Sequence, residues 1–286
     1  MANLKDIRTR IQSVGSTMQI TSAMKMVSAA KLKKAQDAIE NMRPYAEKLT
    51  ELLSGLSASL DKDMGGAYAV ERALKNVLLV PITSNRGLCG ALNTNIIKGT
   101  IHLIENQYAD VNVKVLTIGK KANDQLAKTY EVVGNKGEIF DDLNYDNVAK
   151  IAQGIMNDFA DQKYDRVVLI YNSFKNAATQ IVKTEQFLPI KPEVSNSNIV
   201  LDYIYEPSQK KIVMELIPKS LKTQFYKAIR DAWASEHGAR MTSMHKATDN
   251  AQEMKDDLTL LYNKARQAVI TGEILEIVSG AEALKG

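Results

Sequence analysis

The sequence predicts a mixed α/β protein in which long helices at the two ends of the chain form an antiparallel coiled coil, next to a central α/β domain. Three observations favour this class. Proline, which interrupts helices, is absent from residues 1–43 and 219–286. Apolar residues in both windows recur with heptad spacing, and strand-like and helix-like patterns alternate between them. We expect an N-terminal coiled-coil helix over residues 1–60, an α/β domain over 75–206 and a C-terminal coiled-coil helix over 208–286.

The N-terminal region holds one heptad register along its length, as a left-handed coiled coil does. Pro44 lies inside the register and should bend the helix or loosen one turn. At Thr21, Lys25 and Ser28 the register positions are polar, so we expect the seam to be interrupted there. The apolar residues of the register are Leu4, Ile7, Ile11, Val14, Met18, Leu32, Ala35, Ile39, Met42, Ala46, Leu49, Leu53, Leu56 and Leu60, and those displaced at the interruption are Met24, Met26 and Val27.

The C-terminal region repeats the pattern with smaller residues. Its alanines and Gly272 allow a neighbouring backbone to approach closely, although glycine costs ~1 kcal/mol of helix propensity relative to alanine. Helices of this length would reach roughly 80–100 Å, too long to be buried in a domain of this size. The two most simply pair with each other, antiparallel. The expected C-terminal seam is Met244, Ala247, Ala251, Met254, Leu258, Leu261, Ala265, Ala268, Gly272 and Leu275.

The central region alternates buried strands with amphipathic helices, which favours a Rossmann-like domain with a parallel or mixed sheet covered by helices. We expect strands at 76–83, 112–119, 131–140, 165–174, 179–190 and 199–207, and helices at 91–108, 120–130 and 147–164.

Charge is unevenly distributed along the chain. The whole sequence carries +4, but residues 1–36 contain seven basic residues and a single acid, Asp6. This asymmetry indicates an acidic partner for the N-terminal segment, although a solvated charged face is the commoner reason for a run of charge. Cys89 is the only cysteine, which excludes an internal disulfide and a cysteine metal site. No stretch approaches the ~18 apolar residues of a spanning helix, so we expect no direct membrane insertion.

No motif predicts an active site. The segment "SNRGLCGALN" (84–93) follows a strand and opens a helix, but it lacks the Lys-Ser/Thr of a phosphate-binding loop and the third glycine of a dinucleotide fingerprint. Gly87 and Gly90 more simply permit a tight turn, and Cys89 reads as a small buried hydrophobe. The three histidines, His102, His237 and His245, are scattered. We therefore expect no catalytic residue, no metal and no cofactor.

The basic N-terminal helix could in principle bind nucleic acid or a membrane. It lacks the aromatic residues that stack on bases, and it lacks the Trp, Phe or Leu-rich face that drives interfacial insertion. A protein partner with acidic loops explains its charge and its length together, so no nucleic-acid partner is expected.

Four segments resemble the family of F-type ATP synthase gamma subunits. They are "IRTRIQSVGSTMQITSAMKMVSAAKLKKAQ", "RGLCGALN", "ARMTSMHKATDNA" and "YNKARQAVITGEILEIVSGAEAL", which occur in the family's order and span nearly the whole chain. The absence of the cysteine-bearing insert of chloroplast relatives, and of a presequence before "IRTRI", suggests the bacterial type.

The resemblance implies a mechanical role as the central-stalk rotor of a proton-translocating ATP synthase. In the family, the paired terminal helices turn inside a ring of alternating alpha and beta subunits and drive the catalytic sites of that ring through their states. The α/β domain, with the epsilon subunit, grips the membrane c-ring. The implied location is peripheral, on the cytoplasmic face of the bacterial membrane, and the chain itself is expected to be non-catalytic.

Residues that match the family's contact positions follow from the resemblance. Met24 and Lys25 should lie where acidic loops of the ring touch the shaft. Contacts near the upper bearing are implied for Arg240, Gln267 and Thr271, and an apolar tail in the sleeve for Ile274, Leu275, Ile277, Val278 and Leu284.

Two departures from the family pattern matter. Gly272 stands where the family usually has Gln or Thr, and Asn85 replaces the Asp that commonly precedes "RGLCG". Two other functions stay open at this point: a nucleotide-binding enzyme that dimerises through its coiled-coil arms, and a coiled coil that binds nucleic acid.

Overall fold

The computed structural model describes the backbone of residues 4–57, 67–190 and 209–284. No helix in these ranges has both the length and the apolar character needed to cross a bilayer.

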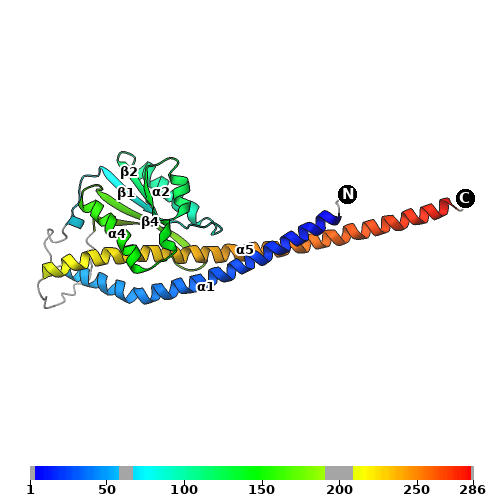
Figure 1. Cartoon of the computed structure of the whole chain (residues 1–286), viewed down its shortest axis with the longest axis horizontal. Coiled ribbons are helices and arrows are strands. Elements are labelled where there is room, and N and C mark those ends of the chain that lie inside the picture. Colours follow the sequence, from blue (N-terminus) through cyan, green and yellow to red (C-terminus); the bar gives the residue numbers. More distant parts are fainter. Residues whose placement is uncertain (1–3, 58–66, 191–208, 285–286) are drawn as a thin grey trace. The chain divides into compact units, whose positions relative to one another are not determined.

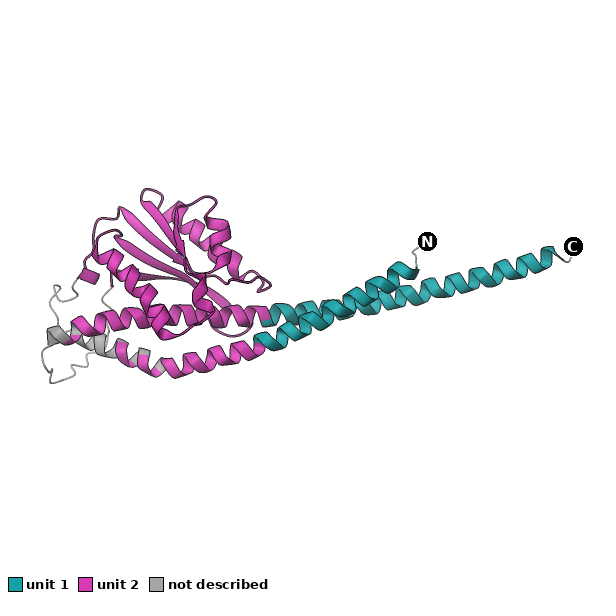
Figure 2. Cartoon of the chain, viewed as in Figure 1, with its two compact units in different colours: residues 1–28, 241–286 teal, residues 29–240 magenta. Residues whose placement is uncertain are grey.

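The chain divides into two compact units (Figure 2). One unit contains residues 1–28 and 241–286, and the other contains residues 29–240. Both long helices, α1 (Leu4–Ser57) and α5 (Gln209–Ala283), contribute to each unit. Pro44 lies within α1 and Pro218 within α5, and neither ends its helix.

The larger unit is built on a five-stranded sheet with strand order β3-β2-β1-β4-β5 (Figure 1). All neighbours pair in parallel except β4 and β5, which are antiparallel. The strands are β1 (Asn76–Pro81), β2 (Asn112–Thr117), β3 (Val132–Asn135), β4 (Arg166–Phe174) and β5 (Gln180–Leu188). The other elements of this domain are α2 (Leu92–His102), the π-helix η2 (Leu103–Gln107), α3 (Lys120–Leu126), the 3₁₀ helix η3 (Gly137–Phe140) and α4 (Tyr145–Ala160).

Helices cover both faces of the sheet, which explains why β1 and β4 read as continuous apolar runs. Alternate residues of β1 point to opposite sides, so Leu78 joins the core beneath α4 and α5 whereas Leu79 joins the core beneath α2. On α5, the buried residues that complete the first core are Leu221, Phe225, Ala228, Ile229 and Ala232. The sheet therefore requires the first half of α5 as part of its own packing.

The predicted fold class is confirmed, with two local differences. The segment 131–140 begins as β3 and then turns into η3, because Gly137 and the loop around it pack against Asn85 rather than continuing the ladder. The helix predicted at 91–108 ends in a single π-helical segment, η2. The predicted strand at 199–207 lies outside the described residues, as does Leu60, and so do the side chains of Ala46, Leu53 and Leu56.

In the smaller unit, the seam of α1 follows the predicted heptad register without a break. Ile7 is 4% exposed and Ser28 is 2% exposed, and the register positions between them are half-buried. The expected interruption is wrong: Thr21 and Lys25 stay in the seam, while Met26 and Val27 point to solvent at 65% and 57% exposure. The heptad position of a residue, rather than its polarity, therefore determines whether it lies in the seam.

The α5 seam agrees with its prediction as far as Ala251, including the half-buried Ala247, and from Met254 onward it differs at every second position. Met244, Ala251, Leu258 and Ala265 are buried or half-buried as expected. Met254 and Leu261, however, are 54% and 48% exposed, and Lys255 and Tyr262 take their places as half-buried residues. Between Ala251 and Leu258 the intermediate seam residue can be three or four positions along, so the sequence allows either Met254 or Lys255. The aliphatic stem of a lysine and the ring of a tyrosine can fill such a position as an apolar residue does. Beyond Ala265, every described residue except Gly272 is exposed.

Among the described residues, a polar contact between two threonines crosses this seam. The hydroxyls of Thr21 and Thr248 are 2.8 Å apart, and either can donate to the other. Each hydroxyl is also within hydrogen-bond reach of a carbonyl on its own helix, that of Met18 for Thr21 and that of Met244 for Thr248. Each threonine hydroxyl can therefore hydrogen-bond either to the other threonine or to a carbonyl of its own helix.

The seam makes a testable prediction with two matched substitutions on α1. Ile7→Ala removes a buried side chain and should lower the local free energy of opening by about 2 kcal/mol. Ile20→Ala removes a side chain that is 61% exposed, and should change it by less than about 0.5 kcal/mol. Hydrogen exchange of the amides of residues 4–28 in the full chain measures both. Equal effects of the two variants would contradict this seam.

Candidate functional site

The carboxyl ends of β1 and β4 form the place where an open α/β sheet usually binds its ligand. In the sheet, β2 lies next to β1 in one direction and β4 lies next to it in the other. The strand order therefore reverses between β1 and β4, and such a switch point is the usual ligand site of an open α/β sheet. The glycine-containing segment 84–93 lies after β1 at this edge. A nucleotide would be expected here if the chain bound one by itself.

The helix α5 occupies this edge with its own residues. The Ser235 hydroxyl donates to the Asn172 carbonyl at 2.9 Å, next to the end of β4. A Cβ added to Gly238 would lie 3.2 Å from the ring of Phe174 and 3.3 Å from Ala177 Cα, so glycine allows α5 to approach this closely. At the end of β4, α5 therefore packs directly against this edge of the sheet.

Arg240 fixes the loop that follows β1. Its Nε donates to the Gly87 carbonyl at 3.2 Å, and its Nη2 donates to the Arg86 and Gly87 carbonyls at 3.2 Å. These bonds hold Leu88 in a left-handed conformation with φ of 63°, where its side chain is 62% exposed. The loop thus presents Arg86 and Leu88 to solvent on a rigid support.

Cys89 lies on the inner side of the same loop. It is 1% exposed and packs with Leu92 and Ala239. Burial raises the pKa of its thiol, which lowers the fraction of reactive thiolate. Cys89 behaves as a small core residue.

Asn85 joins this loop to α3 and η3. Its side-chain amide donates to the Gly137 carbonyl at 2.9 Å, and its carbonyl oxygen accepts from the Lys120 backbone N–H at 2.9 Å. A carboxylate could accept from Lys120 but could not donate to Gly137. Both hydrogen bonds of the Asn85 side chain are therefore between neutral groups.

A buried group of charged and titratable side chains surrounds Arg240. Its guanidinium pairs with Glu236 at 2.7 Å, and both residues are less than 9% exposed. Burial raises the pKa of Glu236, opposed by the nearby cations. The ion pair is satisfied within the chain.

His237 is held neutral beside this pair. Its Nδ1 lies 3.4 Å from Arg240 Nη1, which donates to it, and its ring packs edge-on against Trp233 at 4.9 Å. Its Nε2 is buried without a hydrogen-bond partner among the described residues. Burial, followed by the cations Arg240 and Lys31, lowers the pKa of His237 to about 3.

The described residues hold no group of three or more His, Cys, Asp and Glu side chains arranged to bind a metal ion. The role of this group is structural: Arg240 holds the loop after β1 against α5.

The residues predicted to contact other subunits fall into two environments. Arg240 is 7% exposed and belongs to the larger unit. All of the others belong to the smaller unit. Met24 and Lys25 are half-buried, and the exposed ones are Gln267, Thr271, Ile274, Leu275, Ile277 and Val278.

The smaller unit also exposes apolar residues that were not predicted as contacts. Ile20, Met26 and Val27 on α1, and Met254, Leu260 and Leu261 on α5, are 48–65% exposed. The sequence did contain one indication of this exposed surface. Ile20 and Val27 are seven residues apart, so they occupy the same heptad position, and that position lies outside the seam.

His237 makes a pH-dependent stability prediction. The unfolded chain takes up a proton on His237 near its ordinary pKa of 6.5, whereas the folded chain does not. The stabilisation is therefore complete above that pH and is lost as the pH falls toward 3. Between about pH 7.5 and pH 5.5 the loss should be about 1.4 kcal/mol.

Urea unfolding at both pH values, for the parent chain and for His237→Gln, measures this loss. The variant should lose about 1.4 kcal/mol less than the parent. Glu236, whose raised pKa acts in the opposite direction, is present in both chains and so serves as a common background. Identical losses would show that His237 does not carry the effect.

Comparison with known proteins identifies the family. A family model described as ATP synthase matches residues 3–284. ATP synthase gamma chains from Christiangramia forsetii and Flavobacterium psychrophilum are 64% and 66% identical to this chain, over all of both sequences. The gamma chain of Cytophaga hutchinsonii is 53% identical over 99% of each.

Solved structures agree with this. The central stalk and c-ring structure of the Tetrahymena thermophila mitochondrial ATP synthase contains a chain that is 28% identical, with a TM-score of 0.59, and the match covers 80% of this chain and 99% of that one. A chain of the Euglena gracilis mitochondrial ATP synthase shares the fold at 21% identity, with a TM-score of 0.68 over 98% of this chain and 94% of its own length. The resemblance read from the four sequence segments is confirmed, and the chain belongs to the family of ATP synthase gamma chains.

Proposed function

We propose that this chain is the central rotor shaft of a proton-translocating F-type ATP synthase, and that it couples ion-driven rotation to ATP synthesis in the catalytic ring. One observation carries the proposal. The antiparallel pair of helices in the smaller unit leaves the last turns of α5 unpaired and apolar, with Ile277 70% exposed and Leu275 61% exposed. An exposed apolar surface of this kind is typical of a contact with another protein.

The chain itself is proposed to be non-catalytic. The packing of α5 supports this, because Gly238 and Ser235 contact the end of β4, and Arg240 binds the Gly87 carbonyl in the loop after β1. The nucleotide sites would then belong to the alpha and beta subunits of the ring.

The contacts with the ring are proposed to be apolar and weakly electrostatic. Met24 would give dispersion contact without directional bonds that have to be broken at each step. Lys25 would attract mobile acidic loops, and each exposed pair would contribute only ~0.2–1 kcal/mol. Gln267 and Thr271 would contact the ring nearer the bearing, and the tail of Ile274, Leu275, Ile277, Val278 and Leu284 would fill its sleeve.

Arg240 enters the proposal through the loop it holds. Because its guanidinium is bonded to Glu236 and to two loop carbonyls, it would act on the ring by presenting Arg86 and Leu88. The epsilon subunit and the membrane c-ring are the proposed partners of the α/β domain. The proposed location is peripheral, at the cytoplasmic face of a bacterial membrane.

Purification of the assembled complex tests the assignment as a whole. The chain should co-purify as one copy with a threefold ring that hydrolyses ATP. A stoichiometry of three copies per ring, or recovery of the chain apart from any ATPase, would contradict the proposal.

Met24→Lys tests the contact with the acidic loops. The new ammonium should form an unwanted ion pair and lower the number of protons pumped per ATP by about twofold to fivefold, the factor that 0.5–1 kcal/mol gives. ATP-driven proton pumping and ATP hydrolysis are measured together in membrane vesicles. Ala23→Lys is the matched control, because it adds the same charge at a neighbouring exposed position. Unchanged coupling in Met24→Lys would count against this contact.

The packing of α5 against the carboxyl edge of the sheet predicts that the isolated full chain binds no nucleotide. Calorimetric titration with millimolar MgATP should give no saturable heat. Saturable binding by the isolated chain would overturn the proposal that it is non-catalytic, even if its place in the complex were established.

A further inference from the structure

Arg240 joins the loop after β1 to α5, and His237 takes part in the same contact. The Arg240 guanidinium donates to the Arg86 and Gly87 carbonyls, and its Nη1 also donates to Nδ1 of His237 at 3.4 Å. Because a guanidinium cannot accept a hydrogen bond, this contact requires an imidazole whose Nδ1 carries no proton. The observed arrangement therefore depends on a neutral His237.

The surroundings of His237 disfavour a protonated ring. A proton added to Nδ1 would point at the N–H group of Arg240, so that two donors and two positive charges would face each other. The other ring nitrogen, Nε2, is buried and has no hydrogen-bond partner among the described residues. The whole residue is 5% exposed, so water has little access to an added charge.

The charged groups near this histidine are mainly cations. Burial, followed by Arg240 and by Lys31 of α1, lowers the pKa of the imidazole, and the charge of Arg86 also acts on this group through Glu236. The Glu236 carboxylate is already paired with Arg240 at 2.7 Å. Cys89 faces the pair from the loop, and burial raises the pKa of its thiol, which keeps it neutral. A proton on the histidine would therefore add to an existing excess of positive charge.

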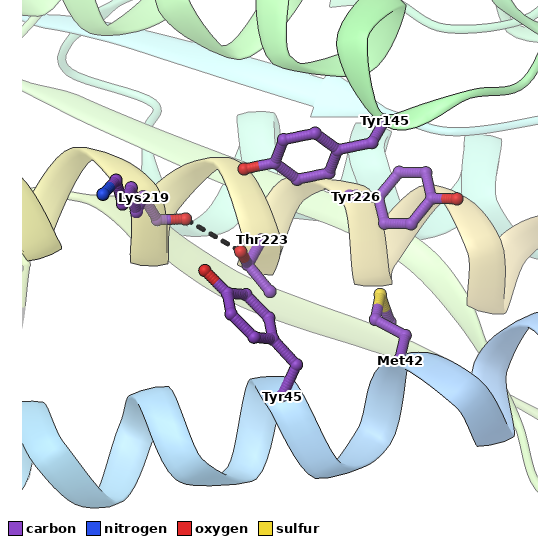
Figure 3. A pocket seen from close by; sticks show the side chains of 6 residues that line it. All are labelled: Met42, Tyr45, Tyr145, Lys219, Thr223 and Tyr226. Atoms are coloured by element: carbon purple, nitrogen blue, oxygen red, sulfur yellow. Dashed lines mark hydrogen bonds between the residues drawn. The ribbon is translucent and has the colours of Figure 1, made fainter.

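A series of packed side chains along α5 supports the imidazole. Its ring packs edge-on against Trp233, with centroids 4.9 Å apart. The Arg230 guanidinium lies 5.8 Å from the centre of the Trp233 ring and 5.0 Å from that of Tyr226. Tyr226 in turn packs edge-on against Tyr145 of α4, with centroids 5.5 Å apart (Figure 3). Because these contacts hold the imidazole in place, a repulsion at Nδ1 acts mainly on Arg240.

Arg240 can leave the loop and keep its carboxylate partner. Glu236 lies one turn away on the same helix, so this ion pair does not depend on the loop. The bonds to the loop carbonyls, by contrast, are lost when the guanidinium moves. Leu88 has a φ of 63° in this loop, a conformation that residues other than glycine rarely adopt. Its relaxation would favour release of the loop.

We propose that protonation of His237 releases the loop after β1 from α5. The proton displaces the Arg240 guanidinium, and the two loop carbonyls lose their donor. The opening is local, and the sheet beneath the loop stays folded. Under the proposed function the loop presents Arg86 and Leu88 to the catalytic ring, so acid would weaken that contact. Only this last consequence rests on the proposed function.

Cys89 can report the opening of the loop. It is the only cysteine of the chain, and it is 1% exposed and packed against Leu92 and Ala239 of α5. The isolated full chain is treated with dithiodipyridine at about pH 7.5 and at about pH 5.5, on either side of the ordinary pKa of histidine. Each labelling rate is divided by that of glutathione at the same pH, which removes the pH dependence of the thiol reaction itself.

His237→Gln separates the titration of this histidine from every other effect of pH. The new side chain cannot be protonated, and its carbonyl oxygen can still accept from Arg240. From the higher to the lower pH, the normalised rate should rise about tenfold more in the parent than in this variant. Glu236, whose raised pKa acts in the opposite direction, is present in both chains. The matched control is His102→Gln, which removes an exposed imidazole from α2 and should behave as the parent does.

Hydrogen exchange of the β1 amides distinguishes local release from unfolding of the whole unit. At the lower pH, the opening equilibrium reported by Cys89 should exceed that of the β1 amides by at least about tenfold. Equal values would overturn the proposal, and so would equal rises of the labelling rate in the parent and in His237→Gln. The comparison with β1 uses the parent alone, so it decides the matter even if the variant does not fold. All of these outcomes leave the rotor assignment untouched.

Discussion

The structure depends on one helix that meets two packing requirements. The part of α5 before residue 241 supplies Phe225 and Ile229 to the core beneath the sheet, and the part after it supplies Met244 and Ala251 to the seam with α1. Between them, Gly238 lets the helix approach the ends of the strands, and Arg240 binds the loop after β1. The sheet therefore cannot be fully packed without the helix that also forms the coiled coil.

Much of the architecture could be predicted from the sequence, because it depends on periodicity. The uninterrupted apolar runs of β1 and β4 identify strands buried on both faces, and proline-free heptads identify the long helices. The α5 seam could not be assigned from spacing alone. Met254 and Leu261 are more apolar than Lys255 and Tyr262, yet the register set by Ala251 and Leu258 favours the longer side chains, and the antiparallel partner decides between the two possibilities.

The site was harder to predict because its main residue is polar and buried. Arg240 was expected to contact other subunits on grounds of family resemblance. Glu236 lies one turn away on the same helix, but the loop carbonyls that Arg240 binds are about 150 residues away in the chain. Nothing in the local pattern indicates that a glycine, a serine and an arginine on a helix will close the edge of a sheet. The exposed tail of α5, from Ile274 to Val278, was predicted as a contact surface, but only the structure shows that α1 leaves it uncovered.

The threonine pair in the α1–α5 seam affects how the two helices respond to a small displacement relative to each other. When two apolar helices slide past each other, dispersion contacts are exchanged gradually, but a cross-helix hydrogen bond normally breaks all at once and leaves a bare donor. Thr21 and Thr248 avoid this, because each hydroxyl can turn back to the carbonyl of Met18 or Met244 on its own helix. When the two helices twist relative to each other through a small angle, each hydroxyl would therefore keep a hydrogen-bond acceptor, and the energy would rise gradually.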